Sequence, residues 1–210
     1  MPQYYPVLLD VTDKPVVIVG GGLVSQRKLR LLLDSDARVT VIAPEATERI
    51  RAWARQGKIA WVAREYREGD LAGAWLAIIG TDDPAVNRRI VDEAHARHIL
   101  VNTVDSVENC DFIVPAVVQR GDLTLAISTG AGSPAMARFL REELERLFPP
   151  EYAQLLQVLS EAREEVRKLA VSPGSERWQQ CIDDELKALV RAGDLEAAKS
   201  RLVQMLAQRS

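Results

Sequence analysis

The chain has 210 residues, 47% of them hydrophobic and 27% charged, with a formal net charge of −3 at pH 7. This composition is typical of a globular protein with a hydrophobic core, and it lacks the basic excess of a general nucleic-acid-binding protein. No apolar run approaches the roughly 18 residues of a membrane span. Cys110 and Cys181 lack the spacing of a zinc site or a disulfide framework. We therefore expect a cytoplasmic protein that binds neither nucleic acid nor membrane.

Strand and helix patterns alternate over the first half of the chain. Runs rich in Val, Ile and Leu predict strands at residues 16–20, 38–42, 59–63, 75–80 and 99–104. Amphipathic patterns between them predict helices at 23–34, 45–56 and 84–97, and a short one near 68–73. Apolar strands separated by helices are typical of a parallel sheet that is covered on both faces. The sequence predicts an α/β fold with a Rossmann-like, doubly wound parallel sheet.

The pattern changes after residue 111. Two apolar runs flank the turn sequence QRGD and predict an antiparallel hairpin, with strands at 112–118 and 122–128. A helix is predicted at 134–147, and the rest of the chain is helical with a break at 171–175. We expect three parts: a dinucleotide-binding domain at 1–111, a hairpin-and-helix region at 112–149 and a small C-terminal helical domain at 150–210.

Two predicted helices begin with clear signals, because a capping side chain precedes a proline in each: Asp83 before Pro84, and Ser133 before Pro134. The helix at 134–147 carries a predicted buried stripe of apolar residues, namely Met136, Phe139, Leu140 and Leu147. The hairpin strands are too apolar to stay exposed, so we expect residues 112–147 to build a dimer interface.

The segment VVIVGGGLVSQRK, residues 16–28, joins a predicted strand to a predicted helix. Gly20 and Gly22 occupy the first two glycine positions of a G-x-G-x-x-G turn, and the small Ser25 stands in the third. Such a turn lets the backbone approach a pyrophosphate at the helix N-terminus. We interpret the segment as an NAD site rather than a tight turn without cofactor, with these binding residues: Gly20, Gly21, Gly22, Leu23 and Val24.

The end of the second predicted strand departs from the usual ribose-binding pattern. Glu45 comes about two residues later than the acidic residue of a typical NAD site, so the backbone of Ala43 and Pro44 could supply ribose contacts. No arginine follows the strand to favour the 2′-phosphate of NADP. We therefore expect NAD as the cofactor, with Ala43, Pro44, Glu45 and Thr81 completing its site.

Four segments together resemble the siroheme synthase and precorrin-2 dehydrogenase family: VIVGGGLVSQRKLRLLL, IIGTDDPAVN, VNTVD and FIVPAVVQRGDLTLAISTGAGSPAMARFLREELE. The resemblance covers about residues 5–150 and keeps the family's order, with Ser25 in place of an alanine. It implies NAD-dependent oxidation of the tetrapyrrole precorrin-2 to sirohydrochlorin in siroheme biosynthesis, by a homodimer. In some members the same site inserts Fe²⁺, and Co²⁺ is an alternative metal. No methyltransferase domain follows, so we expect another protein to make precorrin-2.

Asp105 lies just past the strand predicted at 99–104, at the sheet edge where open α/β folds bind ligands. A carboxylate there could act as general base for an oxidation that removes a hydride and a proton. It could equally cap the turn DSVEN, and the residues alone leave both interpretations open. The family resemblance favours Asp105 as the catalytic residue.

Ser128 and Thr129 enter a loop of small residues that leads to a helix N-terminus, which is a natural anion site or else a simple connection. Arg138 and Arg141 share one face of the following helix. Arginine matches carboxylates well, and the family's substrate carries many of them. We expect Ser128, Thr129 and Arg138 to bind substrate, whereas Arg141 could equally pair with a nearby glutamate.

His95 and His98 have a spacing that could suit a metal, but we interpret them as solvent-facing and predict no metal ligands. Two alternatives to the dehydrogenase remain. A non-enzymatic NAD-sensing module would explain the glycine turn alone. The other is a cobalt or iron chelatase that keeps NAD binding only as a relic.

Overall fold

The structure is a computed structural model that describes residues 3–104 and 106–207. The chain divides into two compact units, residues 1–114 and residues 115–210. Within the described ranges, no helix is both long enough and apolar enough to cross a membrane.

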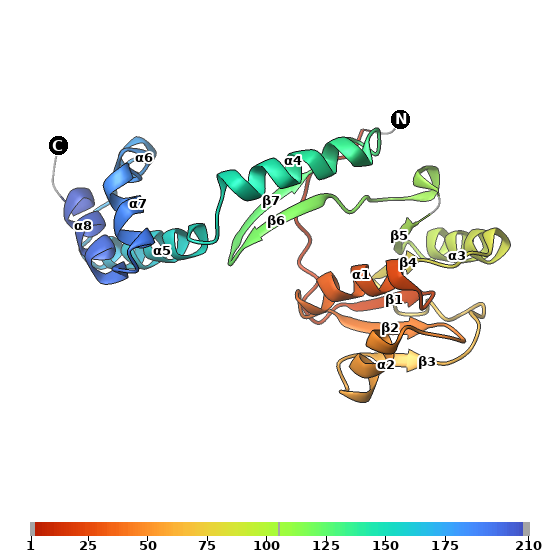
Figure 1. The fold of residues 1–210 in the computed structure, drawn as a ribbon. Helices are drawn as coiled ribbons and strands as arrows, with labels where there is room; N and C mark the ends of the chain where they lie inside the picture. The colour runs from red at the N-terminus through yellow and green to blue at the C-terminus, as the bar shows by residue number, and fades with distance from the viewer. Residues whose placement is uncertain (1–2, 105, 208–210) are drawn as a thin grey trace. The chain divides into compact units, whose positions relative to one another are not determined.

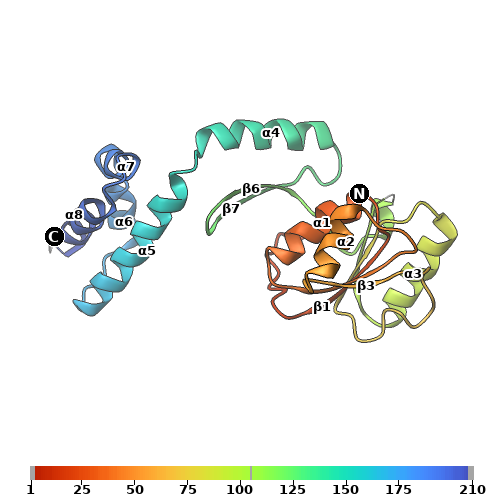
Figure 2. The same cartoon turned by 60° about the horizontal axis from the view of Figure 1, so that its bottom comes forward.

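The first unit is built on a five-stranded parallel sheet with strand order β3-β2-β1-β4-β5 (Figures 1 and 2). Its strands are β1 (Pro15–Val19), β2 (Arg38–Ile42), β3 (Ala60–Val62), β4 (Leu76–Ile79) and β5 (Leu100–Thr103). The order reverses at β1, so the carboxyl end of β1 lies between those of β2 and β4. This is the switch point at which open α/β sheets bind ligands, and the predicted Rossmann-like fold is confirmed.

Helices cover both faces of this sheet. The helices α1 (Leu23–Leu33) and α2 (Glu48–Arg55) pack on one face, with Leu29 and Ile50 fully buried against the strands. The helix α3 (Pro84–Ala96) packs on the other face through Ile90 and its neighbours. The predicted start of α3 is confirmed, because Asp83 Oδ1 accepts from the N–H groups of Ala85 at 2.8 Å and Val86 at 3.2 Å.

The short helix predicted near residues 68–73 is wrong: this segment forms turns. Gly69 and Gly73 adopt φ angles of +95° and +77°, which a right-handed helix does not allow. The buried Leu71 between them explains the helix-like apolar pattern, since its side chain fills the core on the α3 face.

The second unit begins with an antiparallel hairpin, β6 (Ala116–Arg120) and β7 (Leu123–Ile127). The first strand therefore starts later than predicted, and the turn lies at Gly121, where φ is +56°. The preceding residues are held by β5 instead, because the Asp111 N–H donates to the Val101 carbonyl at 2.9 Å. The hairpin packs against α4 (Pro134–Leu147) (Figure 1), whose predicted Ser133 cap is confirmed.

The remainder of this unit is helical, as predicted, with α5 (Tyr152–Lys168), α6 (Ser175–Cys181), α7 (Asp184–Arg191) and α8 (Leu195–Ala207). The predicted break at 171–175 is confirmed, since α6 begins only at Ser175. The helices share a hydrophobic core, which includes Leu155, Val158, Leu186 and Leu202.

The apolar stripe of α4 is exposed in the single chain. Met136, Phe139 and Leu147 are 50%, 55% and 65% exposed, and none of the residues of α4 is buried. The prediction of a buried stripe is therefore wrong for one chain taken alone. The hairpin contacts α4 without covering these side chains.

Candidate functional site

The glycine turn closes against two neighbouring segments of backbone. Gly20 has a φ of +115°, and a Cβ there would lie 2.3 Å from the Gly80 carbonyl oxygen, which follows β4. A Cβ on Gly21 would lie 2.1 Å from the Glu45 carbonyl oxygen, which follows β2. Any side chain at either position would clash with backbone. These two glycines let the turn pass between the ends of the flanking strands.

Gly22 differs, because a Cβ built on it has no atom of the described residues within 4 Å, its own chain neighbours aside. It is the N-cap residue of α1, and no side chain caps this helix terminus. The first turn of α1 also lacks acidic residues. Helix N–H groups without a cap attract anions, and the open space above Gly22 admits a phosphate to close range. These residues fit the pyrophosphate of a dinucleotide.

Beyond β2, Ala43 is buried while Pro44 and Glu45 are exposed. The Ala43 N–H donates to the Val62 carbonyl at 3.2 Å, and the Ala43 carbonyl accepts from Trp61 Nε1 at 3.1 Å. The backbone polar groups of Ala43 are thus tied to β3 and its neighbours. The carbonyl still has a second lone pair for a ribose hydroxyl.

Thr81 stands at the carboxyl end of β4, directly after Gly80, on the same sheet edge as the glycine turn. Its hydroxyl donates to Asn87 Oδ1 at 2.5 Å, and Asn87 Nδ2 donates to the Thr81 carbonyl at 3.0 Å. Asn87 is a buried residue of α3. The pair fixes the backbone beside the turn.

Asp105, the predicted catalytic residue, lies outside the described residues. Its described neighbours belong to the loop between β5 and the short 3₁₀ helix η1 (Val107–Asn109). Thr103 Oγ1 donates to the Ser106 carbonyl at 2.5 Å and accepts from the Ser106 N–H at 3.2 Å. The loop therefore begins at the sheet edge that also carries the glycine turn.

A contact that the sequence did not indicate joins α1 to β5. Lys28 Nζ donates to Asn102 Oδ1, and Asn102 is only 4% exposed. Burial lowers the pKa of Lys28. Lys28 is part of the quoted family motif, and Asn102 is part of VNTVD. No local pattern links two residues that are so far apart in the chain.

The predicted substrate-binding residues lie in the second unit. Ser128 is exposed, and its hydroxyl accepts from the Gly130 N–H at 3.1 Å. Thr129 Oγ1 accepts from the Ser133 N–H at 3.2 Å and donates to the Ser133 carbonyl at 3.1 Å. The two side chains thus shape the loop before α4.

The arginines of α4 form ion pairs along the helix. Arg138 Nε lies 2.9 Å from Glu142 Oε1 with a side chain that is 77% exposed, and this pairing raises the pKa of Arg138. Arg141 pairs with Glu145 and lies 3.6 Å from Glu142. Exposed pairs of this kind are weak.

The two histidines predicted to face solvent lie at the end of α3 and just beyond it. His95 Nε2 lies 3.4 Å from Asp111 Oδ1, and His98 is exposed. Among the residues that the structure describes, no group of three or more His, Cys, Asp or Glu could hold a metal ion.

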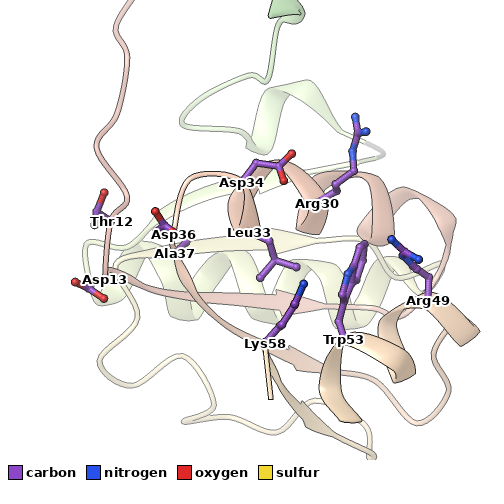
Figure 3. Close-up of a pocket in the computed structure, with 10 residues that line it drawn as sticks. All are labelled: Thr12, Asp13, Arg30, Leu33, Asp34, Asp36, Ala37, Arg49, Trp53 and Lys58. Carbon is purple, nitrogen blue, oxygen red and sulfur yellow. The ribbon is translucent and has the colours of Figure 1, made fainter. Parts of the chain in front are cut away.

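A cavity of about 830 Å³ lies at the amino ends of β1, β2 and β3, opposite the ends that carry the glycine turn (Figure 3). It is lined by residues that precede β1, β2 and β3 together with residues of α1 and α2, whereas the glycine turn follows β1. Leu33, Trp53 and Lys58 meet there, and both acidic and basic side chains surround them. The cavity is therefore separate from the candidate cofactor site.

Three comparisons relate the chain to known proteins. Residues 7–116 match a family model described as "Putative NAD(P)-binding". Siroheme synthase 1 of Pectobacterium atrosepticum is 36% identical over 206 residues, 97% of this chain and 43% of the relative. The siroheme synthase of Methylobacillus flagellatus is 38% identical over 207 residues, 97% of this chain and 44% of the relative. The chain spans less than half the length of these curated relatives.

A solved structure, "SirC, precorrin-2 dehydrogenase", matches with a TM-score of 0.76 and 30% sequence identity. The match covers 96% of this chain and 98% of SirC, so it extends over both units. The NAD(P)-binding match includes β1, the glycine turn and all of the parallel sheet. The chain belongs to the siroheme synthase and precorrin-2 dehydrogenase family, with an NAD(P)-binding domain at residues 7–116.

Proposed function

We propose that the chain oxidises precorrin-2 to sirohydrochlorin with NAD⁺ in siroheme biosynthesis. The observation that carries the proposal is the uncapped N-terminus of α1 above Gly22, at the switch point of a chain that matches SirC over nearly its whole length. A non-enzymatic NAD-sensing module would need only the glycine turn. The match across the second unit therefore favours the enzyme.

The proposed cofactor site consists of the glycine turn and the ends of β2 and β4. Backbone N–H groups at the start of α1 would hold the pyrophosphate, with Leu23 and Val24 beside it. Ala43, Pro44 and Glu45 would contact the ribose, and Thr81 would face the cofactor from β4. When bound, NAD⁺ supplies a hydride acceptor.

The proposed chemistry needs one proton acceptor, since oxidation releases a hydride to NAD⁺ and a proton. We assign Asp105 as this general base because it follows β5 in the sequence, and the carboxyl end of β5 lies at the same sheet edge as the glycine turn. Ser128, Thr129 and Arg138 would bind the carboxylates of the tetrapyrrole. Arg138 suits this role because its present partner, Glu142, is itself partly exposed.

NAD⁺ rather than NADP⁺ is the proposed cofactor. The exposed residues after β2 include Glu45, whose charge would repel a 2′-phosphate. Arg64, the first arginine after β3, lies 2.7 Å from Asp70 in an ion pair. Titration with both cofactors tests this preference, and tighter binding of NADP⁺ would contradict it.

We further propose a homodimer in the cytoplasm. A second copy would cover the exposed stripe of α4, which a monomer leaves in water. The spacing of Cys110 and Cys181 gives no disulfide framework, which suits a reducing compartment.

Incubation of the full chain with precorrin-2 and NAD⁺ tests the function, with NADH and sirohydrochlorin measured together. The proposal predicts one NADH for each sirohydrochlorin. A chain that binds NAD⁺ without forming either product would support the sensing module instead. Adding Fe²⁺ or Co²⁺ to sirohydrochlorin in a parallel assay decides whether the chain also inserts metal.

A further inference from the structure

Lys28 connects the helix of the glycine turn to the far strand of the sheet. Its ammonium group donates to Asn102 Oδ1 on β5, although β4 lies between β5 and β1. None of the described carboxylates forms an ion pair with Lys28. An ammonium group that is partly buried beside a neutral amide gives up hydration, and none of the described carboxylates returns an opposite charge.

Asn102 also bonds to the chain beyond β5. Its Nδ2 group donates to the Phe112 carbonyl at 2.8 Å and lies 3.6 Å from Cys110 Sγ. The amide thus has Lys28 on one side and residues 110–112 on the other. A buried amide whose oxygen and nitrogen are both hydrogen-bonded has one orientation. The place of the Lys28 ammonium group is therefore coupled to the place of residues 110–112.

Cys110 and Thr103 fix the two ends of the intervening loop. The Thr103 N–H donates to Cys110 Sγ at 3.2 Å, and the thiol in turn lies 3.3 Å from the Ser106 carbonyl oxygen. Thr103 Oγ1 also bonds both backbone groups of Ser106. The loop after β5 is therefore held through Asn102, Thr103 and Cys110.

We propose that Lys28 is a positioning residue for the dehydrogenation: through Asn102, it sets the place of the loop after β5 relative to the glycine turn. This inference rests on the proposed function. The start of α1 would hold the cofactor, and the loop after β5 carries the proposed base. Lys28, about one and a half turns into α1, joins these two parts through its bond to Asn102.

Lys28→Met tests the role, because it removes the ammonium group and keeps an unbranched side chain. We expect kcat to fall by about 10- to 100-fold, the scale of a misplacement of about 1 Å between reacting groups. The Kd of NAD⁺ should stay within about twofold, since the turn itself is unchanged. Lys28→Arg should restore most of kcat, because it keeps a donor for Asn102. Arg30→Met, an exposed cation of the same helix, is the matched control and should behave like the parent.

A double-mutant cycle with Asn102→Leu shows whether Lys28 acts through the amide. Residues that act as one unit give non-additive losses. We therefore expect the double variant, Lys28→Met with Asn102→Leu, to lose no more kcat than Asn102→Leu alone. Additive losses would overturn the proposal, as would a Lys28→Met variant with the parent's kcat.

Amide hydrogen exchange gives a readout that does not depend on the substrate. Exchange over residues 103–112 should speed up in Lys28→Met and stay at the parent's rate in Arg30→Met. Unchanged exchange in Lys28→Met would overturn the positioning role even in an active enzyme. A parent chain that does not oxidise precorrin-2 would instead contradict the proposed function, and the exchange result would still decide whether Lys28 holds the loop.

Discussion

The hydroxyl of Ser25 is packed against Gly80: a Cβ on Gly80 would lie 2.5 Å from Ser25 Oγ. Ser25 is 1% exposed, and its hydroxyl has no hydrogen-bond partner among the described residues. The small side chain lets α1 approach β4 closely, as the third glycine of a dinucleotide turn does. The hydroxyl itself adds the cost of an unsatisfied buried group.

Ser25→Ala should therefore stabilise the first unit by about 1 kcal/mol, since it removes an unpaired buried hydroxyl. Urea unfolding followed by tryptophan fluorescence measures this, because three of the four tryptophans, Trp53, Trp61 and Trp75, lie in the first unit. Ser35→Ala is the control, as its exposed hydroxyl bonds the Leu31 carbonyl. A lower unfolding midpoint for Ser25→Ala than for the parent would show that the hydroxyl has a partner.

Gly22→Asp should abolish NAD⁺ binding and leave the fold intact. A Cβ at Gly22 has no described atom within 4 Å beyond its chain neighbours, and the carboxylate of the aspartate would stand where the proposed pyrophosphate must approach. Gly174→Asp is the matched control, because Gly174 is also a helix N-cap with open space around it, in the second unit. Calorimetric titration should show binding for Gly174→Asp and none for Gly22→Asp, with parental circular dichroism in both. Equal NAD⁺ affinity in the two variants would place the pyrophosphate elsewhere.

Phe139→Asp should convert a dimer to a monomer without unfolding the chain. Phe139 is 55% exposed, so a charge there costs the single chain little but would be buried in the proposed interface. Leu169→Asp, at the exposed C-cap of α5, is the control. Sedimentation velocity at micromolar concentration should give a dimer for the parent and for Leu169→Asp. A monomeric parent would reject the interface.

The helical core of the second unit should weaken in acid through Asp183. Asp183 Oδ1 caps α7 by accepting from the Leu186 N–H at 2.9 Å, and Oδ2 lies 2.7 Å from Arg201. These bonds lower the pKa of Asp183, so its stabilisation is present above the unfolded pKa of about 3.9 and is lost as pH falls through the lower folded pKa. Trp178 fluorescence should show a smaller acid-induced loss of stability in Asp183→Asn, which keeps the cap but has no charge to lose. An equal loss in both proteins would assign the acid sensitivity to other groups.

The sequence predicted the parts of the fold that depend on local chemistry. The Val-rich strands, the glycine turn and the Asp83 and Ser133 caps each carry their signal within a few residues. The helix near 68–73 was wrong because buried Leu71 imitates an amphipathic pattern that Gly69 and Gly73 interrupt. The first hairpin strand began too early because Asp111 and Phe112 bond to β5, a contact made through tertiary structure.

For the candidate site, too, the sequence predicted the features that depend on local chemistry and missed those that depend on tertiary contacts. Gly20, Gly21 and Gly22 form the turn between β1 and α1, and the structure shows a steric reason for glycine at Gly20 and Gly21. The link from Lys28 to Asn102 could not be predicted, since it depends on how α1 packs across β4. A lone cysteine such as Cys110 predicts no role from the sequence. Its contacts with Thr103 and Ser106 are visible only in the structure.

The most direct test is steady-state oxidation of precorrin-2 at saturating NAD⁺ by the parent chain and by Asp105→Asn, beside a thermal melt of each. The account predicts that the parent forms sirohydrochlorin and NADH in equal amounts. Asp105→Asn should melt like the parent and bind NAD⁺ but turn over about 10²- to 10⁴-fold more slowly, because an amide cannot take the proton. A parent chain that binds NAD⁺ and leaves precorrin-2 unoxidised would contradict the account, and an Asp105→Asn variant with parental turnover would remove Asp105 from it.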